Sequence, residues 1–311
     1  MAHSLRQLRR SAMQLVIRGA IKATANLPIN RQRSIIATSV ALASRIPMLR
    51  WRVRRNMHLA LGDDVPAGAE YRYFRHLGWV FSNALSTFHY GVTATPIPEE
   101  IVFDDSIRNV DEAVAEGRGA VLISAHWSGH ELVGAMVSRR HPLVMLIRQA
   151  STSEQMARKM KWYSALGAET ILRPRQASTI KDAVAYLQIL KSGKVLAITP
   201  DLLADGSEGE EARIFGRAAR LHRGAFALAA IARAPMLRLS LRWQSDSRVV
   251  AVFERARFVP DAGDRDAVIR AAILDWCQWF EEKLRASPEN WFFWLDKHWS
   301  RFLRSIPRSP E

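Results

Sequence analysis

The residues best suited to chemistry lie in one short run, Val121-Leu-Ile-Ser-Ala-His-Trp-Ser-Gly-His-Glu131. An apolar stretch typical of a buried strand ends near Ser124, and a helix is expected to begin near Gly129, so His126 falls in the turn between them. Open α/β sheets bind ligands at the carboxyl ends of their strands. His126 is therefore a candidate general base, and we expect Glu131, in the first helical turn, to hold its imidazole.

Three alternatives compete for the same residues. His126 and His130 could form a zinc pair, although their order is not HExxH and the sequence indicates no third ligand. Ser124 and Ser128 could act as nucleophiles, but a G-x-S-x-G elbow is missing from the sequence. His126 could also be a structural histidine with satisfied hydrogen bonds. The carboxylate and the strand-end position favour the general base, and we predict no metal site.

No nucleotide-binding motif accompanies this run. A G-x-x-x-x-G-K-[ST] sequence does not occur, because Gly193-Lys194 is followed by Val195. Gly117-Arg-Gly119 precedes its predicted strand, whereas a dinucleotide fingerprint follows one. We therefore predict that the protein uses no cofactor.

The elements that would position these residues follow from the hydrophobic pattern. Beyond a proline-containing break at 93–98, predicted strands at 119–124, 143–148, 168–172 and 194–199 alternate with helices near 110–116, 130–140, 153–166 and 178–191. This alternation predicts an α/β fold with a mainly parallel central sheet flanked by helices. A polar loop at 201–213 separates it from a helix near 222–233, two strands at 236–243 and 249–259 that we expect to pair antiparallel, and a helix over 264–286.

Helices are also expected before the break, over residues 5–22, 31–45, 48–61 and 68–90. We divide the chain into a basic helical membrane-associating region, residues 1–98, and a catalytic domain, residues 99–311. The helix at 5–22 is amphipathic and would either pack on the core or lie in a membrane interface, with arginines on lipid phosphates. No segment has the roughly 20 apolar residues of a standard membrane span.

Positive charge is concentrated at the start of the chain. The 311 residues include 45 Lys or Arg and 30 Asp or Glu, a net charge of +15. Residues 1–62 contain twelve cations and no acid. This excess predicts an anionic partner, which could be nucleic acid, anionic lipid or an acidic protein. The lone cysteine, Cys277, excludes a disulfide framework and a Cys-based zinc cluster.

Aromatic residues gather at the other end of the chain. Five of the ten tryptophans fall within residues 276–299. Tryptophan favours the headgroup region of bilayers, but a packed C-terminal helical region would bury several as well. The sequence leaves both interpretations open.

The His-x4-Glu run at a strand end has the His-x4-Asp/Glu form of the glycerolipid acyltransferase superfamily. Its surroundings resemble the branch of lipid A late (lauroyl/myristoyl) acyltransferases over roughly residues 50–301. Five further segments carry the likeness: Arg54-Arg-Asn-Met-His-Leu-Ala-Leu-Gly62, Met145-Leu-Ile-Arg148, Ile198-Thr-Pro-Asp201, Ile214-Phe-Gly216 and Pro288-Glu-Asn-Trp-Phe-Phe-Trp294.

The resemblance implies a glycerolipid-acyltransferase-like fold. It also implies an enzyme that moves a fatty acyl chain from an acyl-carrier-protein or CoA thioester to a glycolipid hydroxyl, most simply on a lipid A precursor. It implies catalysis by His126 and Glu131. It also implies that Arg148 and Arg173 bind phosphate on the acceptor or on the donor's phosphopantetheine, and that Asp201 has a structural or acceptor-orienting role in substrate binding. A phosphatidylinositol mannoside or lysophospholipid acceptor would use the same chemistry.

With this resemblance the basic N-terminus is better explained by anionic lipid than by nucleic acid. We expect a peripheral or monotopic protein on the cytoplasmic face of the inner membrane, without a nucleic-acid partner. A basic nucleic-acid-binding protein remains the alternative from another class, although it leaves His126 and Glu131 unexplained.

Overall fold

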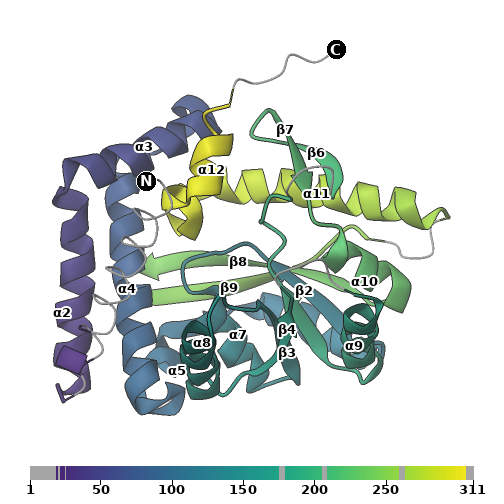
Figure 1. Cartoon of the computed structure of the whole chain (residues 1–311), viewed down its shortest axis with the longest axis horizontal. Helices are drawn as coiled ribbons and strands as arrows, with labels where there is room; N and C mark the ends of the chain where they lie inside the picture. Colours follow the sequence, from purple (N-terminus) through teal and green to yellow (C-terminus); the bar gives the residue numbers. More distant parts are fainter. Residues whose placement is uncertain are drawn as a thin grey trace.

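The computed structural model describes residues 19, 22–24, 26–174, 179–204, 209–258 and 263–305. Among these residues, three long helices precede the sheet (Figure 1): α2 (Ile29–Leu42), α3 (Pro47–Leu61) and α4 (Ala69–Tyr90). Pro47 at the start of α3 and Gly91 directly after α4 are typical boundary residues. These helices confirm three of the four expected in this region, whereas most of the helix predicted at 5–22 lies outside the described residues.

A seven-stranded sheet forms the centre of the molecule, in the order β1-β9-β8-β2-β5-β3-β4. Five neighbouring strands run parallel, and β9 and β1 run in the opposite direction. The bounds are β1 (Ile101–Phe103), β2 (Ala120–Ser124), β3 (Leu143–Arg148), β4 (Glu169–Arg173), β5 (Val195–Ile198), β8 (Met236–Ser245) and β9 (Arg248–Arg255). The mainly parallel α/β fold and the antiparallel β8–β9 pair are confirmed, while β1 was not predicted.

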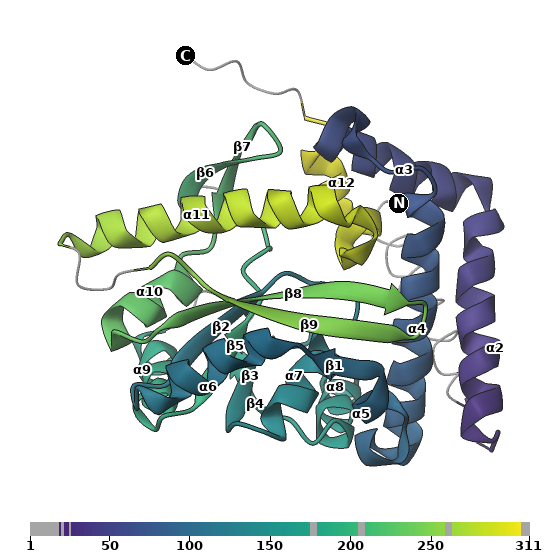
Figure 2. The same ribbon diagram turned by 180° about the vertical axis from the view of Figure 1, so that it is seen from behind.

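Helices lie on both sides of this sheet. In Figures 1 and 2, α11 runs along one side, and α6, α7 and α8 lie on the opposite side. The remaining helices are α5 (Ile97–Glu100), α6 (Arg108–Ala115), α7 (His130–Ser138), α8 (Ser153–Ala165), α9 (Ile180–Lys191), α10 (Gly224–Ala232), α11 (Arg265–Ala286) and α12 (Lys297–Phe302). Their order reproduces the predicted strand–helix alternation.

A second, two-stranded sheet corrects the prediction of a polar loop at 201–213. Strands β6 (Glu210–Ile214) and β7 (Arg217–Leu221) form an antiparallel hairpin, and residues at alternate positions of each strand are buried. Phe215 and Gly216 connect them, both with positive φ, as a two-residue hairpin turn of type I′ requires. Short strands of mixed polarity resemble loops in composition, so the alternation was missed. Residues 205–208 of this predicted polar loop lie outside the described residues.

The N-terminal helices share their core with the sheet. Buried side chains of α3 and α4 belong to one continuous apolar cluster with those of the sheet strands. The proposed boundary between residues 98 and 99 falls within α5, which is four residues long. The core is therefore continuous across the boundary that we drew.

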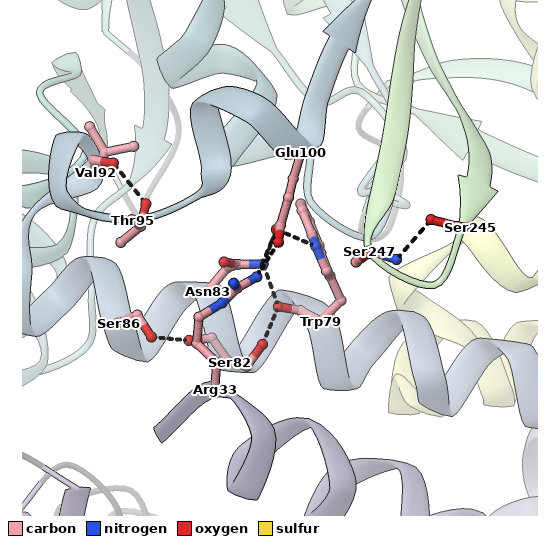
Figure 3. Close-up of polar contacts among 10 residues, drawn as sticks. All are labelled: Arg33, Trp79, Ser82, Asn83, Ser86, Val92, Thr95, Glu100, Ser245 and Ser247. Atoms are coloured by element: carbon pink, nitrogen blue, oxygen red, sulfur yellow. Dashed lines mark hydrogen bonds and ion pairs between the residues drawn. The ribbon is translucent and has the colours of Figure 1, made fainter. Parts of the chain in front are cut away.

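A partly buried polar cluster connects α2 to α4 and α5 (Figure 3). Arg33 of α2 donates to both carboxylate oxygens of Glu100, at 2.6 and 2.7 Å, and each side chain is 16% exposed. Trp79 and Asn83 of α4 donate to the same carboxylate, at 2.8 and 3.3 Å. Glu100 thus joins two N-terminal helices to α5, directly before β1.

Candidate active site

Two neighbouring parallel strands bring His126 and Asp201 together. In the β2–β5 pair, Ile123 lies opposite Ile198, and each functional residue follows its strand residue by three positions. His126 Nδ1 lies 2.6 Å from Asp201 Oδ1, and the backbone N–H of His126 donates to Oδ2 at 2.8 Å. Because an ionised carboxylate only accepts hydrogen bonds, Nδ1 carries the proton and Nε2 keeps its lone pair.

Asp201 is fully buried, and its hydrogen bonds come from the site itself. Trp291 Nε1 donates to Oδ2 at 2.9 Å, and Trp299 Nε1 donates to the Asp201 carbonyl at 3.1 Å. Burial would raise the pKa of Asp201, but electrostatic attraction to His126 and the hydrogen bonds that His126 and Trp291 donate to the carboxylate outweigh burial and hold the pKa below its ordinary value. The resemblance implied a structural or acceptor-orienting role for this residue in substrate binding, and in the structure its buried side chain contacts the His126 ring.

Glu131 is placed differently from our expectation. Its Oε2 accepts a hydrogen bond from Trp162 Nε1 at 3.0 Å, and its Oε1 accepts one from the Tyr163 hydroxyl. Both donors lie on α8. Because α7 begins at His130, Glu131 faces α8 from the first helical turn, while the end of β5 presents Asp201 to the imidazole. The contact that we assigned to Glu131 is therefore made by Asp201, although Glu131 lines the same cavity.

A second imidazole packs against the first. The rings of His126 and His130 lie 5.0 Å apart, and His130 Nδ1 is 2.9 Å from the Trp127 carbonyl, to which it donates. Burial lowers the pKa of His130, with a further contribution from His126, so His130 is held neutral beside the candidate base. Within the described ranges, no group of three or more His, Cys, Asp or Glu side chains could hold a metal ion.

The segment 288–294 fixes the loop that carries His126. The Phe292 N–H donates to the His126 carbonyl at 2.9 Å, and the Ser128 N–H donates to the Asn290 carbonyl at 2.6 Å. The Phe293 ring lies 4.3 Å from the His126 ring. This segment was recognised in the sequence only through the family resemblance, and the structure gives it a contact with the candidate base.

All five C-terminal tryptophans are buried. Trp276, Trp279, Trp291, Trp294 and Trp299 are each at most 4% exposed. Of the two interpretations that the sequence left open, packing in the core is confirmed, and a position of these rings in the bilayer is excluded by their burial.

Gly129 allows the loop to approach α4. Its φ of +104° is one that side-chain-bearing residues rarely adopt, and a Cβ atom there would lie 2.9 Å from the Trp79 ring. His130 begins α7 directly after it. The glycine therefore sets where His126 and the start of α7 lie against the N-terminal helices.

A cavity of about 160 Å³ opens beside His126. One part of its wall is charged and is formed by Glu131, Arg148, Lys159 and Arg173 together with the two imidazoles. Arg148 and Arg173 are register partners at the ends of β3 and β4. Another part is apolar and includes Leu122, Met145, Leu146, Ile147, Ala197 and Leu239. The cavity thus combines a base, cations and a surface that suits a hydrocarbon chain.

Sequence reasoning missed the residues that α8 contributes. Lys159 and Tyr163 line the cavity, and Trp162 donates to Glu131. Nothing in the local sequence marks these three positions, because an amphipathic surface helix has the same pattern. Only the packing of α8 beside α7 brings them to His126.

Comparison with known proteins identifies a family. A family model described as "Bacterial lipid A biosynthesis acyltransferase" matches residues 1–301. A search of curated proteins found no match. In the part of the chain that the structure describes, no helix has the length and apolar composition needed to cross a bilayer.

The two carboxylates can be distinguished by matched substitutions. We expect Asp201→Asn to lower kcat for acyl transfer by about 10²- to 10⁴-fold, because the amide neither fixes the imidazole tautomer nor stabilises the imidazolium. Glu131→Gln keeps an acceptor for the α8 donors and should cost less. Steady-state kinetics with melting curves as the folding control would test this. A greater loss in Glu131→Gln than in Asp201→Asn would contradict the assignment.

Proposed function

The chain belongs to the bacterial lipid A biosynthesis acyltransferase family, and we propose that it moves a fatty acyl chain from a thioester to a hydroxyl of a membrane glycolipid, in the first instance a lipid A precursor. The observation that carries this proposal is the His126–Asp201 pair beside a cavity that is charged on one part of its wall and apolar on another. A phosphatidylinositol mannoside or a lysophospholipid would be an alternative acceptor for the same chemistry.

His126 acts as the general base. Its Nε2 takes the proton of the acceptor hydroxyl as that oxygen attacks the thioester carbonyl carbon. The carbon–sulfur bond then breaks, the thiolate leaves, and the imidazolium returns the proton to sulfur. Asp201 holds the ring through Nδ1 and stabilises the imidazolium formed between these steps. Atoms and protons balance without a metal or cofactor in the scheme.

The remaining walls of the cavity bind the substrates in this proposal. The apolar side chains, including Met145 and Leu239, surround the acyl chain and exclude water from the ester-forming carbon. Arg148 and Arg173 bind phosphate, either on the acceptor or on the phosphopantetheine that acyl carrier protein and CoA share. Glu131 supports the site as the residue that joins α7 to α8, since its oxygens accept from Trp162 and Tyr163.

We also propose that the protein binds the cytoplasmic face of the inner membrane without spanning it. The corner between α2 and α3 exposes large apolar side chains: Leu42 at 56%, Met48 at 71% and Trp51 at 59%. Arg45 and Arg54 are exposed on the same segment, which contains no acid. Apolar side chains between arginines suit an anionic bilayer, and a nucleic-acid surface would leave the apolar ones unexplained.

Removing the base tests the chemistry. We expect His126→Ala to lower acyl transfer from acyl-CoA or acyl carrier protein to a glucosamine-disaccharide acceptor by at least about 10²-fold, since the variant has no base for the hydroxyl proton. Mass spectrometry of the acylated product measures the rate. His141→Ala is a matched control, because His141 bonds to Asp111 rather than to a residue of the site. Full activity of His126→Ala would show that the mechanism is wrong.

Removing the exposed apolar side chains tests the membrane contact. The double variant Met48→Ser/Trp51→Ser should bind less to vesicles of phosphatidylethanolamine and phosphatidylglycerol in a flotation assay, because it buries less apolar area in the interface. Ile180→Ser/Val184→Ser is the matched control, since these side chains on α9 are 86% and 48% exposed. Equal flotation of the first variant and the wild type would contradict this contact, as would tight binding to duplex DNA without flotation.

A further inference from the structure

Lys159 is a cation of the catalytic cavity that the proposed mechanism does not use. It lies on α8 and lines the charged wall together with Arg148 and Arg173. Its Nζ donates to the Arg148 carbonyl at 2.8 Å. An ammonium group has three N–H bonds, so this contact fixes the position of Nζ and leaves two donors. Among the described residues no other protein acceptor engages them.

Lys159 lies among charged groups of the cavity wall. Glu131 is the carboxylate whose charge acts on Lys159. Both of its oxygens already accept hydrogen bonds from side chains of α8. Burial lowers the pKa of Lys159, Glu131 opposes that change, and the Arg148 guanidinium adds to it. Glu131, Arg148 and Lys159 thus carry charges on one wall of the cavity, where Lys159 and Arg148 repel each other. A phosphate bound between these two cations would offset that repulsion.

The other cations of α8 are engaged away from the cavity. Arg158 pairs with Glu154 at 2.8 Å, one turn earlier on the same helix. Lys161 Nζ lies 4.4 Å from the centroid of the Phe88 ring. Neither lines the catalytic cavity. Of the three cations on α8, Lys159 is therefore the one that lines the catalytic cavity. Lys161 provides a matched control on the same helix.

We infer that Lys159, held by the Arg148 carbonyl and flanked by Arg148 and Arg173, forms a phosphate subsite beside His126. The subsite rests on the proposed function, because it serves a substrate of that reaction. Since Nζ is anchored, it fixes where a phosphate lies relative to the base. It thereby selects substrates in which the reacting group and the phosphate have the matching separation.

A binding measurement that needs no turnover tests the subsite. Inorganic pyrophosphate is titrated into the full-length protein by calorimetry, comparing the wild type with Lys159→Met, Lys159→Arg and Lys161→Met. We expect Lys159→Met to weaken binding by roughly 10- to 100-fold, the effect of losing a hydrogen bond to a charged group. Lys159→Arg should recover most of the affinity, and Lys161→Met should match the wild type. Unchanged affinity in Lys159→Met would overturn the subsite.

Kinetics then identify which substrate carries the phosphate. One arm compares palmitoyl-CoA with phosphate-free palmitoyl-pantetheine as donor, and the other compares phosphorylated with dephosphorylated glucosamine-disaccharide acceptors. Lys159→Met should raise KM for the phosphate-bearing member of one arm only, with kcat little changed. A KM that rises equally for phosphate-free substrates would mean that Lys159 is structural, and would overturn the inference. Failure of the wild type to turn over any pair would refute the proposed function, while the titration still decides the subsite.

Discussion

The buried carboxylate of Asp201 is the group around which the site is organised. A carboxylate without solvent contact is tolerated only when hydrogen bonds offset its desolvation. Here the ring and the backbone N–H of His126 and the indole of Trp291 supply them. Because these donors come from two separate segments of the chain, the charge of Asp201 requires β2, β5 and the C-terminal segment to lie in fixed positions.

The N-terminal helices extend this chain of contacts to the surface of the molecule. Asn56 on α3 donates to the Trp294 carbonyl at 2.7 Å and to Ser300 Oγ at 2.9 Å. The Tyr73 hydroxyl on α4 donates to the Phe292 carbonyl at 2.9 Å. The segment that contacts His126 is thus bonded to α4 and to α3, the helix whose corner with α2 we propose to meet the membrane.

The sequence predicted the elements better than the contacts. The hydrophobic pattern located α3 and α4 as helices and β2 and β3 as short apolar runs that are buried along most of their length, and it placed His126 at a strand end. It could not choose between Glu131 and Asp201 as the partner of the imidazole, because the order of strands in the sheet is a tertiary property. The likeness of Ile123-Ser-Ala-His126 and Ile198-Thr-Pro-Asp201 was the available signal. No sequence signal marked Lys159, because its position in the cavity depends on how α8 packs against the sheet and α7.

We infer that Asp201 fixes the tautomer of His126 and leaves Nε2 as the base. Nitrogen-15 NMR of the His126 imidazole tests it most directly, at a pH where the ring is neutral. We predict a proton on Nδ1, an unprotonated Nε2, and a tautomer that Glu131→Gln does not alter. A proton on Nε2, or a tautomer that changes in Glu131→Gln but not in Asp201→Asn, would contradict it.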